Sequence, residues 1–264
     1  MKYIENQEEV HVEKIKTKWN RRYQNLPAMI LVFILLIIWQ AGAMEMNAAY
    51  ILPSPIDIIK KIWELRIILF RVHLPATLGV TLMGLFISLF IGLVLAIAMD
   101  AFPWVYRAVY PLVIVSQTIP TTAIAPLFVL WFGYGIWSKV LVTILITFFP
   151  VVITVYDGFQ AVPEEQEQLL YTFGAKKTDI FVKLKFPAVL PNFFSALKMA
   201  VPLSIIGAAI GEWLGAQSGL GYFSRRMMTQ LDGAGVFAPI VLLAAVALLL
   251  VGFIALLEKW IIRY

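Results

Sequence analysis

The chain has 264 residues, of which 61% are hydrophobic and only 14% are charged. A soluble domain carries about 25% charged residues, so this composition excludes an ordinary soluble globule and predicts an all-α protein that crosses a membrane several times. The absence of cysteine excludes disulfides and thiolate metal sites, and membrane topology explains the net charge of +5 better than nucleic-acid binding does.

The N-terminal quarter of the chain contains three different segments. The polar residues 1–26 are rich in lysine and arginine and are predicted to form a cytoplasmic tail. The uncharged run Tyr23–Met44 is long enough for one crossing, so we place a first transmembrane helix at 27–44. Residues 45–74 mix isoleucines with basic residues after the rigid turn LPSP, which predicts an amphipathic segment on the extracytoplasmic surface.

The transmembrane core is predicted at 75–257 and is followed by a short tail, 258–264. Its apolar runs give five further spans, at 75–99, 108–131, 136–156, 188–211 and 236–257. Gly133-Tyr134-Gly135 forms a reverse turn between the third and fourth spans. Basic residues are more frequent on one side of a six-span arrangement, which predicts a plasma-membrane protein with both termini and the loop 158–187 in the cytoplasm.

The loop 158–187 has the pattern of two short helices separated by a glycine. Three glutamates follow Pro163, where a helix dipole favours negative charge, and the apolar Leu169, Leu170 and Phe173 share one helical face. Gly174 then fits a left-handed helix end, and Pro187 is predicted to end the second short helix. From the residues alone, a docking element and an ordinary solvated loop are equally good interpretations.

The spacing in this loop resembles the cytoplasmic signature of type I ABC importer permeases, which reads E-A-A, three residues, Gly, nine residues, then I-x-L-P. Here Gly174 is followed, after nine residues, by Leu184-Lys185-Phe186-Pro187. Gln168 stands where the family has its acid, and leucines replace the two alanines. The stretches LPSP, FPAVLPNFFSALKMA and GEWLGAQSGLGY are similar to the nitrate, sulfonate and taurine branch, and within it to permeases for a thiamine pyrimidine precursor.

The resemblance implies a division of labour with other chains. The permease would form the path for a small polar or anionic solute, with nitrate, sulfonate, taurine and riboflavin as substrates of permeases with the same frame. It would bind two copies of an ATPase that holds the ATP, a second permease copy and an extracytoplasmic substrate-binding protein, and would carry no cofactor itself. The expected ATPase-coupling residues are Glu164, Glu165, Glu167, Gln168, Leu169, Leu170, Phe173, Gly174 and Ala175.

Polar residues at membrane depth are the candidates for a translocation path, because such groups are costly in hydrocarbon unless they find partners or water. The candidates are Ser116, Gln117, Thr121, Thr122 and Glu212. The alternative is structural: the hydroxyls bridge helices and relieve a break at Pro120, and Glu212 caps the following loop.

Other polar and small residues also leave two interpretations open. Lys198 either serves a function inside the bundle or extends to the headgroups. Gly207, Gly211 and Gly215 suit either a subunit contact or packing within one subunit. Asp100 and Asp157 are predicted to be helix-end residues.

Two other classes of function compete with an importer subunit. An intramembrane serine enzyme would need a base, but the two histidines, His11 and His73, both precede the candidate Ser218, and no HExxH motif is present. A passive channel has no use for a structured cytoplasmic docking loop. The sequence therefore favours a transport permease that is not an enzyme.

Overall fold

The computed structural model describes residues 26–46 and 48–262, and the predicted tail 1–26 lies almost wholly outside them. The described part contains helices and no strand, which confirms the all-helical class. Two short π-helical turns are labelled η1 and η2. The elements are α2 (Leu26–Met46), α3 (Pro55–Glu64), α4 (Arg66–Ile68), η1 (Leu69–His73), α5 (Leu74–Ala101), α6 (Pro103–Thr118), α7 (Thr121–Phe132), α8 (Ile136–Gln160), α9 (Glu164–Thr172), α10 (Lys177–Ile180), η2 (Phe181–Lys185), α11 (Phe186–Gly215), α12 (Leu220–Thr229) and α13 (Gly233–Ile261).

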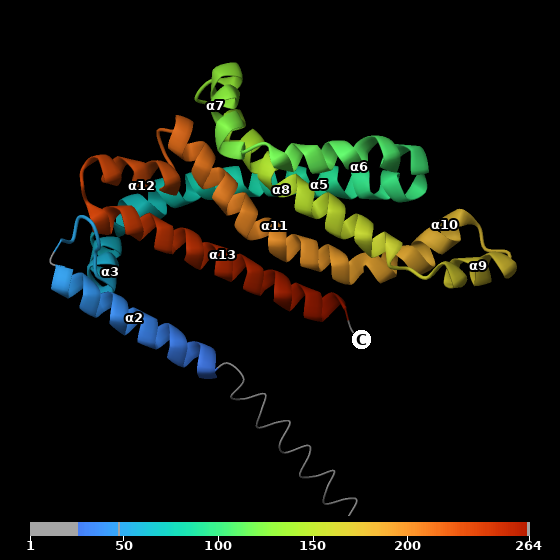
Figure 1. The fold of residues 1–264 in the computed structure, drawn as a ribbon, viewed down its shortest axis with the longest axis horizontal. Helices are drawn as coiled ribbons and strands as arrows, with labels where there is room; N and C mark the ends of the chain where they lie inside the picture. Colours follow the sequence, from blue (N-terminus) through green and yellow to red (C-terminus); the bar gives the residue numbers. More distant parts are fainter. Residues whose placement is uncertain (1–25, 47, 263–264) are drawn as a thin grey trace, which may run out of the picture.

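Five helices in the described residues are long and apolar enough to cross a membrane: α2, the continuous helix Arg66–Ala101, α8, the continuous helix Lys177–Gly215, and α13. The bent pair α6–α7 gives a sixth crossing if it counts as one span. The elongated arrangement in Figure 1 places most of these helices roughly side by side, with α9 and α10 at one end and α3 and α12 at the other.

The helix α8 is the centre of the bundle and packs against both α5 and α11. Glycines allow the close approach: a Cβ added at Gly84 or at Gly207 would lie 2.4 Å and 2.7 Å, respectively, from atoms of Thr143. Gly211 meets the backbone of Lys139 in the same way. Small residues at such contacts are typical of helix packing in lipid, where close van der Waals contact holds helices together. The predicted glycine face therefore packs within one chain.

The boundary predicted at Pro187 is wrong, because the helix that begins at Lys177 continues through η2 into α11. In η2 the Phe186 N–H donates to the carbonyl of Phe181, five residues back. This wider turn accommodates the ring of Pro187, which lacks an N–H and would clash in an ordinary α-helical turn.

The same device precedes Pro75, where the Leu74 N–H donates to the carbonyl of Leu69 in η1. The second membrane helix therefore begins at Arg66 rather than at Pro75. As a result, the amphipathic helix expected within 45–74 is limited to α3, which ends at Glu64.

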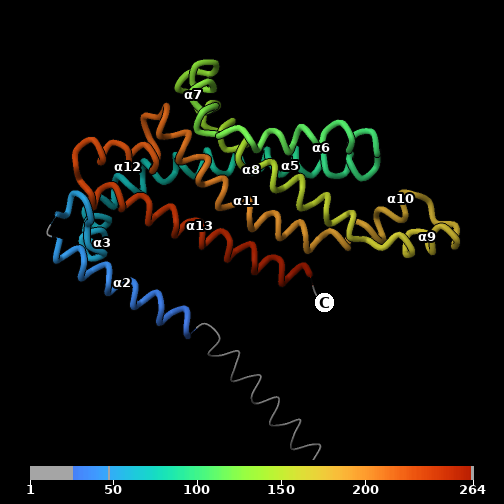
Figure 2. The backbone as a smooth tube through the Cα atoms, in the orientation of Figure 1, coloured from blue at the N-terminus to red at the C-terminus, as the bar shows by residue number. Residues whose placement is uncertain are grey.

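The third predicted span, 108–131, is not one straight helix. The axes of α6 and α7 meet at 98°. Ile119 and Pro120 between them are extended, since the proline ring disfavours the helical conformation of the preceding residue. Figure 2 shows that α7 turns away from the layer formed by α5 and α6.

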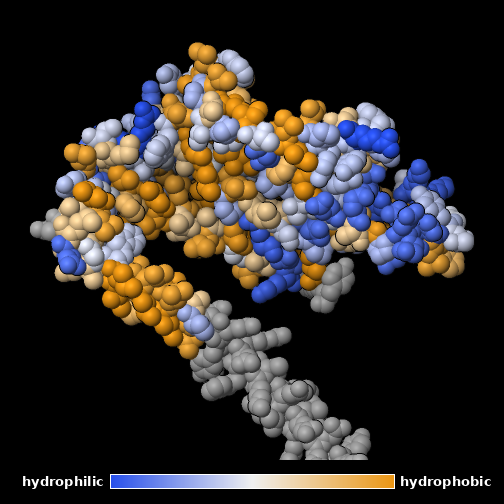
Figure 3. All heavy atoms as spheres, in the orientation of Figure 1, coloured by the Kyte–Doolittle hydropathy of each residue, from blue (hydrophilic) through white to orange (hydrophobic). Residues whose placement is uncertain are grey.

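Among residues 26–46 and 48–262, the side-chain contacts of α2 with other segments lie near its C-terminal end. There the Trp39 indole donates to the carbonyl of Pro53 at 3.1 Å, and its ring lies 5.8 Å from that of Phe237. The remainder of α2 diverges from α13 (Figure 1). Only 6% of the most apolar stretch of α2 is buried. Figure 3 shows its apolar surface, whereas polar residues gather around α9 and α10.

The helix α3 packs onto the corner between α12 and α13. Ser54 caps its start by accepting the Asp57 N–H at 3.2 Å. Leu69 and Phe223 belong to the apolar cluster beneath it. Lys61 forms an ion pair with Asp232 at 2.9 Å, and this hydrogen-bonded contact raises the pKa of Lys61.

Candidate functional site

The loop between α8 and α11 has the predicted helix–glycine–helix form. The Gly174 N–H donates to Tyr171 and the Ala175 N–H donates to Leu170, which together form the hydrogen-bond pattern of a Schellman end. Gly174 has φ +81°, so the prediction of a left-handed glycine after α9 is confirmed. The turn directs the chain from α9 back towards α10.

The side chains on α9 are accessible, and none of its residues is buried. Leu169 and Phe173 are 56% and 80% exposed, so two of the three expected anchors form an apolar surface outside the bundle. Leu170 is only half-buried and lies closer to the body. Glu164, Glu165 and Gln168 are exposed around this surface, and Ala175 is half-buried beyond the turn.

Glu167 behaves differently from the other acids of α9, because it turns back towards the body. Its carboxylate lies 3.1 Å from Lys185 Nζ, which also contacts Asp100 at 3.0 Å. The sequence predicts Asp100 only as a helix-end residue, and Lys185 appears there only within the motif Leu184-Lys185-Phe186-Pro187. Asp100 is a lone acid directly after the apolar run of the second span, and this is the only hint of the contact in the sequence. Nothing near Asp100 in the sequence identifies Lys185 as its partner.

The expected path residues on α6 and α7 separate into two groups. The Ser116 hydroxyl donates to the Val113 carbonyl at 2.7 Å, so it satisfies the backbone of its own helix. Thr121 is half-buried at the first turn of α7. Gln117 and Thr122 are exposed next to the break. Two of the expected path residues, Gln117 and Thr122, thus lie at the surface of this chain beside the break.

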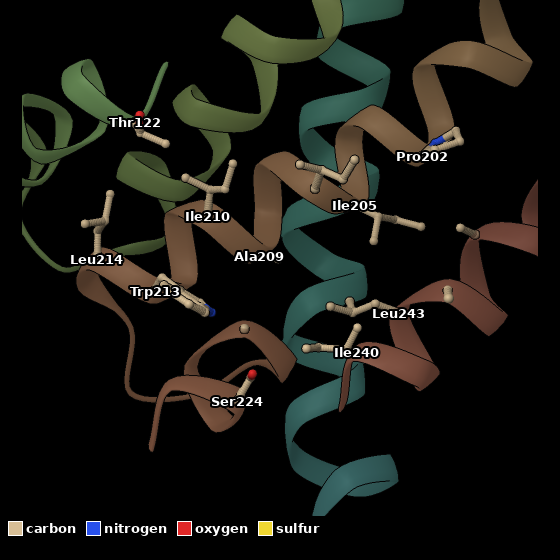
Figure 4. A pocket seen from close by; sticks show the side chains of 14 residues that line it. Thr122, Pro202, Ile205, Ala209, Ile210, Trp213, Leu214, Ser224, Ile240 and Leu243 are labelled. Atoms are coloured by element: carbon tan, nitrogen blue, oxygen red, sulfur yellow. The ribbon is translucent and has the colours of Figure 1, made fainter. Parts of the chain in front are cut away.

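An apolar groove of about 620 Å³ lies between α7, α11, α12 and α13. Figure 4 shows Ile205, Ile210, Trp213 and Leu243 along it, with Thr122 at one edge and Ser224 near another. Its lining is suited to hydrocarbon groups rather than to a polar solute.

Glu212 is almost fully buried, with 1% of its surface exposed, and belongs to a polar clasp around the loop between α11 and α12. Three consecutive N–H groups, from Gly219 into the first turn of α12, donate to side chains of two helices, Arg66–Ala101 and α11. The Gly219 N–H donates to His73 Nδ1 at 3.1 Å, the Leu220 N–H to Thr77 Oγ1 at 2.8 Å, and the Gly221 N–H to Glu212 Oε2 at 2.8 Å. Of the two interpretations left open for Glu212, the Gly221 contact supports the one in which it caps this loop.

Lys198 also has a partner within the chain. Its Nζ lies 2.9 Å from Glu258, and this ion pair joins α11 to α13. The two side chains are 31% and 25% exposed. An ion pair of this kind satisfies a charge near the membrane without requiring the side chain to extend to the headgroups.

Five helices, or six with the bent pair, that are long and apolar enough to cross a membrane define a multi-pass membrane protein within the described residues. Residues 88–263 match the model of the binding-protein-dependent transport system inner membrane component. The chain belongs to this family: it is the membrane-spanning permease subunit of a type I ABC importer. Permeases of this family work with a separate ATPase and a substrate-binding protein.

Among named relatives, the formylaminopyrimidine transport permease protein ThiX of Halalkalibacterium halodurans is 51% identical over 89% of this chain and 94% of its own length. The riboflavin transport system permease protein RibX of Chloroflexus aurantiacus is 33% identical over 89% of this chain and 88% of its own. The inward-facing MetNI methionine ABC transporter has the same fold, with a TM-score of 0.67 and 19% identity over 76% of this chain and 99% of that one.

Proposed function

We propose that this permease imports a formylated aminopyrimidine, a precursor of the thiamine pyrimidine. The observation that carries the proposal is the 51% identity to a formylaminopyrimidine permease, spread over nearly the full length of both chains. Riboflavin and aliphatic sulfonate permeases have the same frame at 33% and 28% identity. The fold is therefore common to several substrates, and only the level of identity favours this one.

An uptake assay tests the substrate. Cells that express this chain with its ATPase and binding protein should accumulate labelled formylaminopyrimidine, and the uptake should stop when ATP is depleted. Riboflavin and taurine serve as competitors and should have little effect at equal concentration. Strong competition by either of them, or uptake that persists without ATP, would contradict the proposal.

We further propose that two copies of this permease form the path between their third to fifth spans. Gln117 and Thr122 support this, because the break between α6 and α7 exposes both, and Thr121 lies beside them. Ser116 donates to Val113 of its own helix and Glu212 holds the start of α12 through the Gly221 N–H, so we place both behind the path. In the uptake assay, Gln117→Ala and Thr122→Ala should lower transport several-fold. Thr118→Ala is the control, because that hydroxyl only donates to Val115 of its own helix.

The proposed orientation puts both termini and α9 in the cytoplasm. Because the chain has no cysteine, single cysteines introduced at Thr178 and Ser218 would be the only reactive thiols. Thr178 lies in α10 and Ser218 lies between α11 and α12, at opposite ends of a 39-residue helix. An impermeant thiol reagent should label the two positions from opposite sides of the membrane. Labelling of both from the same side would refute the orientation.

We propose that α9 is the element on which the ATPase docks. In an importer with two permease copies, each α9 would bind one of the two ATPase subunits. Its exposed Leu169 and Phe173 supply apolar anchors, and the exposed acids and Gln168 form a polar rim. Buried anchors with a charged rim are the usual way in which an amphipathic helix binds a groove.

A further inference from the structure

The helix α9 is held to the bundle by very little apolar packing. No residue of α9 is buried. Within the described part of the chain, α9 makes no extensive contact with any other helix. A cavity of about 430 Å³, bordered by Ile97, Tyr171 and Phe181, lies between α9, the end of α5 and η2. The position of α9 therefore depends on something other than a packed interface.

Three charged side chains hold α9 in position against the bundle. Lys185 Nζ lies 3.0 Å and 3.1 Å from the two carboxylate oxygens of Asp100, and 3.1 Å from Glu167 Oε1. The side chains are 16%, 7% and 23% exposed, respectively. Gln160 also donates to Asp100 at 3.3 Å. Networks of partly shielded charges hold their geometry better than isolated pairs in water.

These three charges connect three separate elements. Lys185 lies on the continuous helix Lys177–Gly215, and Asp100 lies at the end of the helix Arg66–Ala101. Glu167 is the member that belongs to α9. The corner that leads into α6 begins directly after Ala101. A displacement of α9 would therefore pull, through Lys185, on the helix Lys177–Gly215 and on the end of α5. The end of α5 leads into α6, which runs to the break at Pro120.

The covalent connections of α9 to the bundle are one turn at each of its ends. At one end the chain turns through Gly174 with φ +81°, and a Cβ added there would meet no atom within 4 Å. At the other end Pro163 is extended, with ψ 131°. Val162, directly before Pro163, is 9% exposed and anchors the first turn to the bundle, whereas the ion contacts of Lys185 form the connection between α9 and the end of α5.

We infer that Lys185 is a positioning residue for coupling: through Glu167 and Asp100 it carries the movement of α9 to the α5–α6 corner. The inference rests on the proposed docking of the ATPase on α9. It separates two tasks on that helix. Leu169 and Phe173 face outward to bind the ATPase, while Glu167 faces inward and joins α9 to the membrane helices.

The test uses the complete importer, with permease, ATPase and binding protein, in liposomes. Two quantities are measured: the amount of ATPase that stays bound and the amount of substrate transported per ATP hydrolysed. Lys185→Met should lower the transport ratio about tenfold, as expected for loss of hydrogen bonds to charged groups, while the ATPase stays bound. Lys185→Arg should restore most of the ratio, because the adjacent cavity has room for a guanidinium.

Two further variants make the result specific. Lys183→Met is the matched control: Lys183 is 75% exposed and, among the described residues, pairs with Asp179 of its own helix, so the ratio should not change. Lys185→Met leaves the Asp100 carboxylate without its cation, and the double variant Asp100→Asn/Lys185→Met removes that charge. The double variant should insert normally and remain uncoupled.

The inference is overturned if Lys185→Met and the double variant keep the wild-type ratio, or if either one releases the ATPase. A failure of the proposed docking on α9 gives a different result. In that case Phe173→Ala keeps the ATPase bound, whatever transport-to-hydrolysis ratio the Lys185 variants show.

Discussion

Replacement of Phe173 by alanine should release the ATPase from the purified importer while the permease still inserts and accumulates. Phe173 is 80% exposed on α9, and its ring has no core to stabilise in this chain. Burial of such a side chain in a partner groove contributes about 1.5–3 kcal/mol. Its loss therefore weakens docking about tenfold to a hundredfold. Co-purification of the ATPase with a tagged permease measures the effect.

Phe186→Ala is the matched control for this experiment. Phe186 is also an exposed phenylalanine, at 50%, but it lies at the start of α11 and not on α9. It should keep the ATPase bound. Equal retention of the ATPase by Phe173→Ala and Phe186→Ala would show that α9 is an ordinary loop helix.

Gly174 provides a second test of the same surface, through the backbone alone. Its φ of +81° is accessible to asparagine but strained for a β-branched residue, at about 1–3 kcal/mol. A side chain there meets no neighbour, so steric contact does not contribute. Gly174→Val should therefore redirect α9 and abolish substrate-stimulated ATP hydrolysis, whereas Gly174→Asn should retain most of it. Equal substrate-stimulated ATP hydrolysis in the two variants would show that the left-handed turn at Gly174 does not position α9 for docking.

The second large effect is expected at Gly219, where alanine should prevent stable folding of the permease. Gly219 has φ +119°, and an added Cβ would lie 2.2 Å from the carboxyl carbon of Glu212. The carboxylate is buried and holds the Gly221 N–H, so it cannot move without leaving that N–H unpaired. Thermal unfolding in detergent should show a strongly lowered midpoint or no folded protein.

Gly79→Ala is the control, because a Cβ at that glycine of α5 has no neighbour within 4 Å. Alanine favours a helix over glycine by about 1 kcal/mol, so this variant should be as stable as the natural chain or more so. A midpoint for Gly219→Ala equal to that of Gly79→Ala would contradict the clasp.

The same clasp separates two roles of Glu212. Glu212→Gln keeps an oxygen that accepts from Gly221, so the fold should survive, whereas Glu212→Ala leaves a buried N–H unpaired at a cost of about 1–3 kcal/mol. If Glu212 acts on transport only through the clasp, Glu212→Gln transports normally. Lost transport in a stable Glu212→Gln protein would mean that its charge has a role of its own.

Local patterns were sufficient for much of this protein. Apolar run lengths predict the membrane crossings, because a bilayer sets the length that each one needs. The polar group around Pro120 marks the place where the third span breaks. Gly174 follows a short amphipathic helix and adopts the predicted left-handed conformation, since the requirement is confined to one residue and its turn.

The helix boundaries beside Pro75 and Pro187 were beyond local reasoning. An isolated proline predicts a helix end because it lacks an N–H and its ring clashes with the preceding turn. Here a π-helical turn before each proline removes the clash, and the helix continues. The cost of that irregular turn is offset by packing of the long helices, which a local pattern does not contain.

The sequence by itself determined the class of the protein, its membrane segments and the loop that resembles a docking element, because length, hydropathy and turn chemistry are local properties. Only the tertiary structure decided which charges and donors meet. Lys185 contacts Asp100 across 85 residues, and the Gly219 N–H reaches His73 across 146. Such contacts depend on how α5, α8 and α11 pack, and a lone charge or a buried amide carries no record in the sequence of the distant group that satisfies it.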